Sequence, residues 1–407
     1  MRVMTETNLP SPSSRLLPTA PPDGLIAAAL LAFLATAGLF YVNIMAAIVD
    51  GLVAGLGLTD SQAGNIGAVN IYGAALGALM AVLVVKRAPW RPLAVACLMA
   101  LIAIDLASTL ISSGDLLLIV RLAHGIIGGL LVGTGFAVIA RTKNPDRTFG
   151  MLLFVQFGLG GLGVMTLPRL VPVYGAQALF IALALFSLAT LIMVPFLAKY
   201  PPERGEKAQV SDARIAWLPL SLNLAGIFFF QAANMALLAY VIRLGIDYGL
   251  DRNYVSLALG LATWVALAGP LVVMVLGLKF GRFWPLAAGM ALTLAGIGLF
   301  HLSGNPVAYM VANCCTGITW GMVIAYLFGM SAQFDKAGRT AALGGFVSKM
   351  GLASGPFAAG YLLGHGGGFS GLINFTFLGL ALSAVFMLIP ARALDRARRQ
   401  TPNLSGD

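Results

Sequence analysis

Lys349 places a cationic side chain inside an apolar segment of the chain. The residues from Ala341 to Gly360 form a run long enough to cross a lipid bilayer, and this lysine lies near its middle. An ammonium group at the centre of a membrane-spanning helix costs about 2.5–3.5 kcal/mol on insertion scales. We therefore expect Lys349 to have a partner. The partner is either an anionic substrate or ion, or a carbonyl group or polar side chain of the protein itself.

A second polar group combines Asp105, Arg121 and His124. Arg121 and His124 are three residues apart, so they share one face of a helix. Asp105 lies in the preceding apolar segment, at a depth that matches Arg121 if the two helices are antiparallel. An ion pair between Asp105 and Arg121 is therefore predicted. Two interpretations stay open: a static pair that joins the helices, or a group that changes protonation together with His124, whose imidazole can sense a proton gradient.

Long apolar stretches recur along the whole chain and must hold these polar residues in the membrane. Hydrophobic residues make up 59% of the sequence and charged residues 10%, whereas soluble domains carry about 25% charged residues. Because about 20 apolar residues cross a bilayer, the sequence predicts an all-α polytopic membrane protein. The twelve predicted transmembrane helices cover roughly 24–48, 61–85, 92–112, 116–140, 150–172, 176–198, 216–242, 253–278, 284–302, 307–333, 340–363 and 371–390.

The basic residues gather in alternate connections between these helices. With the N-terminus inside, 20 of the 25 Lys and Arg residues lie in tails and loops on one side. The positive-inside rule then predicts a bacterial inner-membrane protein with both termini in the cytoplasm. The net charge of +10 reflects this topology, so we expect lipid and no nucleic acid as a partner. We predict a disordered tail over 1–22, a central cytoplasmic loop over 199–215 and a cytoplasmic tail over 391–407.

The two halves of the chain, 23–198 and 216–390, resemble each other at an offset of about 192 residues. For example, Arg147-Thr148 aligns with Arg339-Thr340. This duplication predicts two pseudo-symmetric six-helix bundles, with a site between them near the membrane midplane and alternating access by rocking of the halves.

The residue that the repeat makes equivalent to Lys349 is not a cation. Lys349 is about ten residues into its predicted helix, or roughly 15 Å from the inner end. Its counterpart in the first half is Phe157, and the counterpart of Arg121 is Asn313. The duplication alone therefore does not account for either cation.

Several stretches resemble the motifs of the major facilitator superfamily. The segment from Arg121 to Gly129 looks like that family's R-x-x-x-G-x-x-x-G motif, and 158–168 and 351–360 resemble its antiporter-type Gly/Pro motifs. The loop at 84–91 keeps the basic residues of G-x-x-x-D-R-x-G-R-R/K but lacks its acid. The resemblance implies the family's twelve-helix fold and secondary transport, with the first, fourth, seventh and tenth helices around a central cavity. We expect no cofactor, no metal site and a monomer.

That arrangement turns the intramembrane polar residues into candidates for substrate contact. Asn313, Thr316 and Trp320 share a helical face, which sets them apart from scattered polar residues. Asp50, Arg169 and Arg243 lie near the predicted outer helix ends, too shallow for a central site. The candidates for substrate binding are Lys349, Arg121, Asn43, Gln156, Gln231, Asn234, Trp264, Asn313, Thr316 and Trp320, and those for proton coupling or gating are His124, Asp105 and Arg121.

The leading hypothesis is secondary active transport of a small organic anion, with a carboxylate as the favoured class, by proton coupling or exchange. If Asp105 pairs with Arg121, Lys349 is left to meet an anion, and a positive cleft of low dielectric concentrates anions. A proton-driven exporter of drugs or metabolites is the alternative, which the Gly/Pro-rich helices favour. Scattered methionines give a copper importer less support. The sequence contains no hydrolase or phosphate-loop motif that would indicate an enzyme.

Overall fold

The computed structural model describes residues 19–85, 88–200, 217–334 and 339–400. Throughout these ranges the regular structure is helical, and the prediction of twelve membrane-spanning segments is confirmed. The first half contains α1 (Leu25–Ala37), α2 (Phe40–Asn43), α3 (Met45–Leu56), α4 (Asp60–Val84), α5 (Trp90–Ser108), α6 (Gly114–Ile139), α7 (Pro145–Tyr174), α8 (Gln177–Met193) and η1 (Val194–Phe196). The second half contains α9 (Trp217–Asp247), α10 (Arg252–Val265), α11 (Ala268–Leu276), α12 (Phe283–Leu299), η2 (Phe300–Leu302), α13 (Pro306–Gln333), α14 (Arg339–Gly364) and α15 (Gly368–Gln400).

The first span differs from the prediction of 24–48, because it reaches Leu56 and is broken into α1, α2 and α3. The first break lies at Gly38, which packs so closely against α6 that an added Cβ would lie 2.7 Å from Cγ2 of Val132. The second break lies at Ile44 and leaves Asn43 at the end of the short helix α2. The close approach of α6 therefore interrupts the span near its middle, where a polar residue is exposed to a site.

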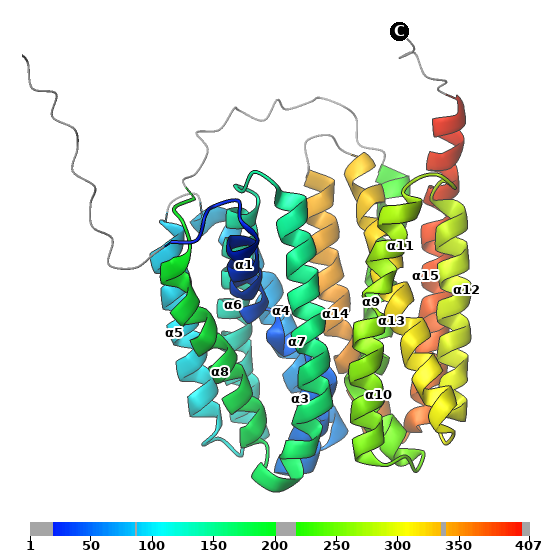
Figure 1. Ribbon diagram of the computed structural model, residues 1–407. Coiled ribbons are helices and arrows are strands. Elements are labelled where there is room, and N and C mark those ends of the chain that lie inside the picture. The colour runs from blue at the N-terminus through cyan, green and yellow to red at the C-terminus, as the bar shows by residue number, and fades with distance from the viewer. Residues whose placement is uncertain (1–18, 86–87, 201–216, 335–338, 401–407) are drawn as a thin grey trace, which may run out of the picture.

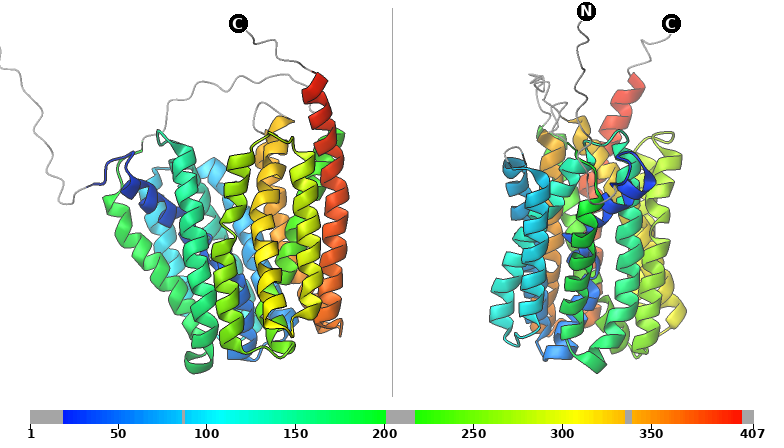
Figure 2. Two further views of the ribbon diagram at one scale, coloured as in Figure 1. Left: turned by 45° about the vertical axis from the view of Figure 1, so that its right-hand side comes forward. Right: turned by 60° about the vertical axis from the view of Figure 1, so that its left-hand side comes forward.

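Helices α1–α8 and α9–α15 form two bundles that stand side by side (Figures 1 and 2). Helix α1 begins and α15 ends at the same end of the molecule, which we name the terminal face; the opposite end is the far face. The two bundles meet where α4 packs on α14, α7 on α10 and α3 on α9. These three helix pairs, which we name the seam, position everything that lies between the halves.

Glycines let α4 and α6 approach closely within the first bundle. An added Cβ at Gly73 would lie 2.5 Å from the carbonyl oxygen of Leu122. Gly125 and Gly129 of α6 likewise face the backbone of α4, at Asn70 and Ala74. Small residues at such contacts give the close packing that drives helix association in lipid. The glycines of the R-x-x-x-G-x-x-x-G stretch thus have a packing function here.

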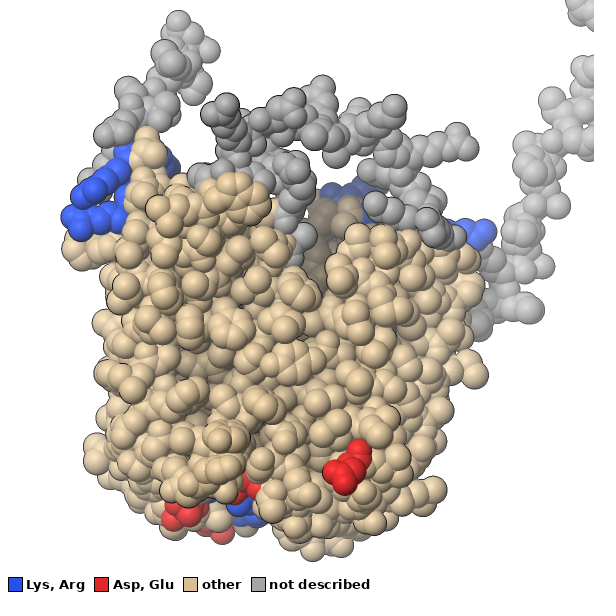
Figure 3. All heavy atoms as spheres, turned by 180° about the vertical axis from the view of Figure 1, so that it is seen from behind, with Lys and Arg blue, Asp and Glu red and all other residues tan. Residues whose placement is uncertain are grey.

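The seam contacts lie toward the far face. Between α9 and α4, the hydroxyl of Tyr240 donates to the carbonyl oxygen of Asp60 at 2.6 Å. Between α4 and α14, the hydroxyls of Tyr72 and Ser354 are 2.8 Å apart. Between α7 and α10, Arg169 donates to the carbonyl oxygen of Asn253 at 2.8 Å. At the terminal face the space-filling view shows a hollow between the two halves (Figure 3). The molecule is therefore closed at the far face and open at the terminal face.

The predicted tails and central loop fall largely outside the described residues. Of the tail predicted over 1–22, the last residues are described and lie on the first bundle: Ala20 donates its backbone N–H to the carbonyl oxygen of Phe196 at 2.8 Å. At the other end, α15 continues as helix past Pro390 to Gln400. The second bundle therefore projects a helical extension at its terminal face (Figure 1).

Candidate functional site

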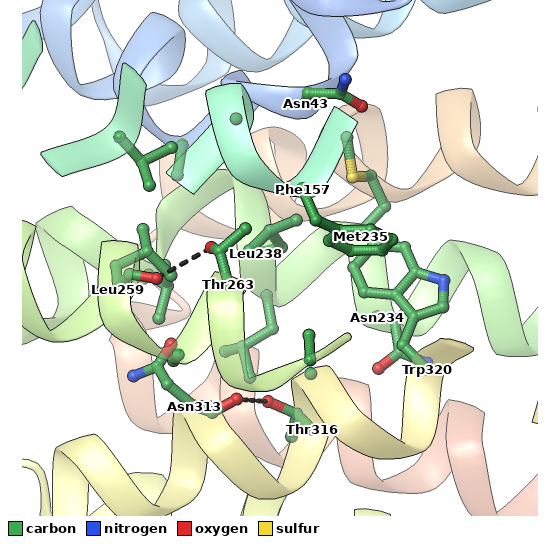
Figure 4. Close-up of a pocket in the computed structure, with 18 of the residues that line it drawn as sticks. Asn43, Phe157, Asn234, Met235, Leu238, Leu259, Thr263, Asn313, Thr316 and Trp320 are labelled. Atoms are coloured by element: carbon green, nitrogen blue, oxygen red, sulfur yellow. Dashed lines mark hydrogen bonds between the residues drawn. The ribbon is translucent and has the colours of Figure 1, made fainter. Parts of the chain in front are cut away.

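A central cavity of about 290 Å³ lies between the two bundles. This volume is at the lower end of the range for small-molecule pockets, which are commonly about 300–1,000 Å³ and mostly apolar. Helices of both halves contribute to its wall, which is drawn in Figure 4. Among the described residues, the lining carries no charged side chain, and its polar members are Asn43, Gln156, Gln231, Asn234, Thr263, Asn313, Thr316 and Trp320.

The first half supplies two side-chain amides to the cavity. Asn43 lies at the end of α2, and its Nδ2 atom is buried without a hydrogen-bond partner among the described residues. Gly160 of α7 lies close beside it, since an added Cβ there would be 3.3 Å from the Cβ of Asn43. Gln156, one turn earlier on α7, lines the cavity and its amide makes no hydrogen bond with any described residue. Both amides are available to a bound solute.

The second half holds its polar side chains in a bonded network. Gln231 of α9 is buried, donates from Nε2 to the hydroxyl of Ser348 at 2.7 Å, and accepts from the indole N–H of Trp320 at 2.6 Å. Asn234 and Asn313 each donate their amide to the carbonyl oxygen four residues earlier, at 2.8 Å. These bonds fix the side chains and leave the amide oxygens of Asn234 and Asn313 as acceptors.

Sequence reasoning missed one polar lining residue, Thr263 of α10. Its hydroxyl donates to the carbonyl oxygen of Leu259 at 2.8 Å (Figure 4). Trp264, the neighbour that the sequence suggested, is outside the cavity. It is 41% exposed, and its indole N–H donates to the carbonyl oxygen of Gly158 in α7 at 3.0 Å. A one-residue step turns a helix by about 100°, so the two positions face different surroundings, and Trp264 belongs to the seam.

Lys349 is partly exposed on α14 and lies about one turn from Leu352, a residue of the cavity wall, on the side of the terminal face. It is not itself part of the wall. It forms no ion pair or hydrogen bond with any residue that the structure describes. Its repeat counterpart Phe157 does line the cavity, as does Gly160, the counterpart of Leu352. Lys349 is therefore a cation about one helical turn from the cavity wall, without an ion-pair partner among the described residues.

Asp105 and Arg121 form the ion pair that their matching depths predicted. Nη1 of Arg121 lies 2.7 Å from Oδ1 of Asp105, and both side chains are fully buried. A second nitrogen, Nη2, donates to the hydroxyl of Ser108. The guanidinium lies 4.9 Å from the ring centre of Phe180 and 5.9 Å from that of Tyr41. Arg121 thus lies inside the first bundle and does not reach the central cavity in this conformation.

His124 joins this pair and links it to α4. Its Nε2 is 3.4 Å from Oδ1 of Asp105, and its Nδ1 is 2.9 Å from Nδ2 of Asn70. The same Asn70 nitrogen donates to the carbonyl oxygen of Arg121 at 3.0 Å, which fixes the orientation of the amide. Nδ1 must then accept, so the network assigns the proton of a neutral imidazole to Nε2, facing Asp105. We name Asn70, Asp105, Arg121 and His124 the buried polar cluster.

Two further ion pairs cross the seam at the far face and correct the expectation for Asp50 and Arg243. Asp50 is fully buried because α3 continues past it, and it pairs with Arg252. Arg243 places Nε 2.6 Å from Oδ1 of Asp60. The sequence contained a signal for both pairs: Asp50 and Arg243 are 193 positions apart and Asp60 and Arg252 are 192 apart, which is the repeat offset. We name these two ion pairs the far-face latch.

No protein-family model and no curated protein matches this sequence. Solved structures do match it in three dimensions. A mutant of the nucleoside transporter NupG superposes with a TM-score of 0.67 at 12% identity, over 91% of this chain and 98% of that one. A D-xylose–proton symporter gives 0.69 at 13% identity, over 89% and 97%.

A third solved structure is a bacterial homologue of the human lysosomal transporter Spinster, in an inward-facing and unoccupied conformation. It superposes with a TM-score of 0.64 at 13% identity, over 94% of this chain and 98% of that one. Identities this low establish likeness of fold and nothing finer. With its helices in two facing bundles around a central cavity, this chain shares the fold of these three solved structures.

Proposed function

We propose that this protein is a secondary transporter that moves a small organic anion, with a carboxylate as the favoured class, across a membrane by alternating access. A cavity between two bundles that is closed at one face and open at the other supports the transport cycle. The three solved neighbours are described as transporters or as a homologue of one.

The observation that carries the anionic class is the unpaired Lys349. A cation in the interior of a membrane protein normally pairs with another group, and this one has no ion pair or hydrogen bond with the described residues. It lies about one helical turn from the cavity wall, so a solute that binds there and carries a carboxylate would complete the missing pair. The free amides of Asn43 and Gln156 would hold the same solute from the opposite half.

The buried polar cluster supports proton coupling. A neutral His124 accepts from Asn70 at Nδ1, so protonation at Nδ1 would break that bond while it strengthens the attraction to Asp105. The contact between α4 and α6 would change as a result, and α4 is also a seam helix. Protonation inside the first bundle could thus bias the seam without any contact between the proton site and the solute.

The charge distribution supports a cytoplasmic terminal face. In Figure 3 most of the visible Lys and Arg side chains lie at the terminal face, and Asp and Glu lie toward the far face. By the positive-inside rule the terminal face would be cytoplasmic, in an inner membrane with both termini inside. The conformation described here would then be the inward-open one.

Uptake into proteoliposomes tests the anionic class. We expect Lys349→Ala to lower uptake of lactate or benzoate about tenfold or more, because a hydrogen-bonded charge is lost, and Lys349→Arg to retain part of it. Lys279→Ala, which removes an exposed lysine at the terminal face, is the matched control. Carboxylate uptake that survives Lys349→Ala unchanged would rule out the anion proposal.

A second candidate is a neutral polar solute such as a sugar or nucleoside. The cavity lining itself is uncharged among the described residues, and two of the solved neighbours are a nucleoside transporter and a D-xylose–proton symporter. Uptake of xylose and uridine in the same vesicles separates the candidates. Neutral-solute uptake that is indifferent to Lys349→Ala, with no carboxylate uptake in the unmodified protein, would favour this second candidate. Export of cationic drugs has less support, because Asp50 already pairs with Arg252.

A further inference from the structure

Two aromatic side chains from opposite halves face the central cavity. Phe157 belongs to α7 and Trp320 to α13, and both are part of the wall (Figure 4). Within the described residues, neither ring stacks on another aromatic ring. Both rings thus contribute aromatic surface to the cavity wall, and a planar ring gains most from contact with such surface.

The indole of Trp320 is held in one orientation. Its only hydrogen-bond donor, the ring N–H, is used by Oε1 of Gln231 at 2.6 Å, and Gln231 is in turn tied to Ser348 at 2.7 Å. Gln231 is 5% exposed, so this tie is shielded from water. Trp320 consequently has no hydrogen bond to offer a solute, and what it presents is a fixed aromatic surface.

Side-chain amides of both halves keep hydrogen-bonding capacity for a solute. Asn43 and Gln156 of the first half have amide N–H groups without a partner among the described residues. Asn234 and Asn313 of the second half each use one amide N–H on a helix carbonyl and retain their acceptor oxygens. A solute that presents an acceptor to the first half and a donor to the second can use both sets.

We infer that the cavity takes a planar aromatic monocarboxylate that carries a hydroxyl or amino group away from the carboxylate. The ring would lie against the aromatic surface that Phe157 and Trp320 contribute, and the carboxylate would accept from Gln156 and Lys349. The hydroxyl or amino group would donate to Asn234 or Asn313. The inference rests on the proposed function for its anionic part, because Lys349 supplies the positive charge; the aromatic part rests on the cavity wall alone.

Three matched probes separate the two parts: para-hydroxybenzoate, its saturated-ring analogue para-hydroxycyclohexanecarboxylate, and the uncharged para-hydroxybenzamide. Binding to the full-length protein in lipid nanodiscs is measured by calorimetry. We expect para-hydroxybenzoate to bind most tightly. Saturation of the ring weakens binding about fivefold to tenfold through lost aromatic contact, and loss of the charge weakens it about tenfold or more.

Variants of Trp320 test whether the cavity wall causes the preference for an aromatic ring over a saturated one. Trp320→Leu is expected to remove the difference between the aromatic and saturated acids, whereas Trp320→Phe retains most of it. Trp284→Leu, which changes a tryptophan that is 66% exposed on α12, serves as the matched control and leaves the difference unchanged.

The possible failures are distinct. If the saturated acid binds as tightly as the aromatic acid, or if neither aromatic probe binds, the aromatic inference is overturned, whereas the anion proposal is judged by the Lys349 variants. If the benzamide binds as tightly as the benzoate but ring saturation still weakens binding, the anionic part fails and the aromatic wall stands. Because the unmodified protein gives these comparisons, the result does not depend on whether Trp320→Leu folds.

Discussion

At the scale of single residues, the membrane interior contains two cations in opposite situations. Arg121 is fully buried, paired with Asp105 and hydrogen-bonded to Ser108, and near two aromatic rings. Lys349 is partly exposed and has no such partner among the described residues. Removing a partner from a buried ion pair is destabilising by about 3–5 kcal/mol, which makes Arg121 part of the framework. The unpaired lysine is the one that can serve a solute.

The role of His124 in proton coupling can be tested by substitution. If the buried polar cluster carries the coupling proton, His124→Gln should flatten the pH dependence of uptake. Glutamine keeps a polar group near Asp105 and Asn70 but cannot gain a proton. His365→Gln, at an exposed position near the far face, is the control. A pH profile identical to that of the unmodified protein would assign the cluster a purely structural role.

Some of this chemistry could be predicted from residue types and spacing, and some could not. The Asp105–Arg121 pair followed from two depths in adjacent helices, because antiparallel neighbours bring equal depths together. The role of Asn70 did not follow, because it comes from a helix packed across glycines, and the approach of α4 to α6 is a property of the fold. Likewise, the exclusion of Trp264 from the cavity depends on the rotation of α10, which no local pattern specifies.

At the scale of helices, the far-face latch follows the internal symmetry of the chain. The repeat relates Asp50 to Arg243 and Asp60 to Arg252, so each ion pair is the symmetry counterpart of the other. All acids of the latch come from α3 and α4, and both arginines from α9 and α10. One half thus presents negative charge and the other positive charge at their contact. Opposite charges at equivalent positions favour pairing between the halves over pairing within either one.

Weakening the latch should shift the protein toward a form that opens at the far face. We expect Arg243→Gln combined with Arg252→Gln to leave Asp50 buried without its partner and to raise the rate at which a water-soluble maleimide labels Val42→Cys, a cavity-wall reporter, from the far side. The rise should be several-fold, because a partly exposed pair contributes roughly 0.2–1 kcal/mol and the loss of the partner of a buried charge costs more. Lys279→Gln at the terminal face is the control. Unchanged labelling would mean that the helix contacts alone close this face.

The broken first span marks the limit of element prediction. Its apolar composition predicted a single helix ending near residue 48. Hydrophobicity alone does not indicate where a glycine lies in close contact with a neighbouring helix. Gly38 breaks the span where α6 passes, and the chain then needs the extra residues to Leu56 to reach the far face. The span predicted over 253–278 is likewise interrupted, between α10 and α11, whereas most of the other spans follow one long apolar segment each.

At the scale of the whole molecule, the proposed transport cycle requires a second state that is closed at the other face. The repeat predicted the two bundles, but it could not say which face is closed, because one sequence encodes both states. In this conformation the far face is the closed one. There α4 and α14 are in close contact, and an added Cβ at Gly364 would lie 3.1 Å from the Cβ of Ser61.

A disulfide across this contact tests the movement. Ser61→Cys with Gly364→Cys, in a protein whose native Cys97, Cys314 and Cys315 are replaced, has Cβ atoms slightly nearer than the usual 3.5–4.5 Å and needs only a small adjustment. Oxidation should lock the far face and abolish transport, and a reductant should restore it. Each single-cysteine protein is its own control. Full transport by a protein shown to be cross-linked would exclude a rocking motion that separates α4 from α14.

Dissolved ions can reach the far-face latch from one side of the membrane only. Arg243 and Arg252 expose about a quarter of their side chains, 25% and 26%, and Asp60 exposes 25%, so dissolved ions can approach these charges from the far side. The screening length of a salt solution is about 10 Å at 0.1 M and about 3 Å at 1 M. Concentrated salt on the far side would loosen the latch, whereas the same salt on the other side would not reach it. Under the proposed transport cycle, the salinity of the far-side compartment would therefore shift the balance between the two states, and such a transporter would turn over differently in fresh and in saline surroundings with no change in its solute.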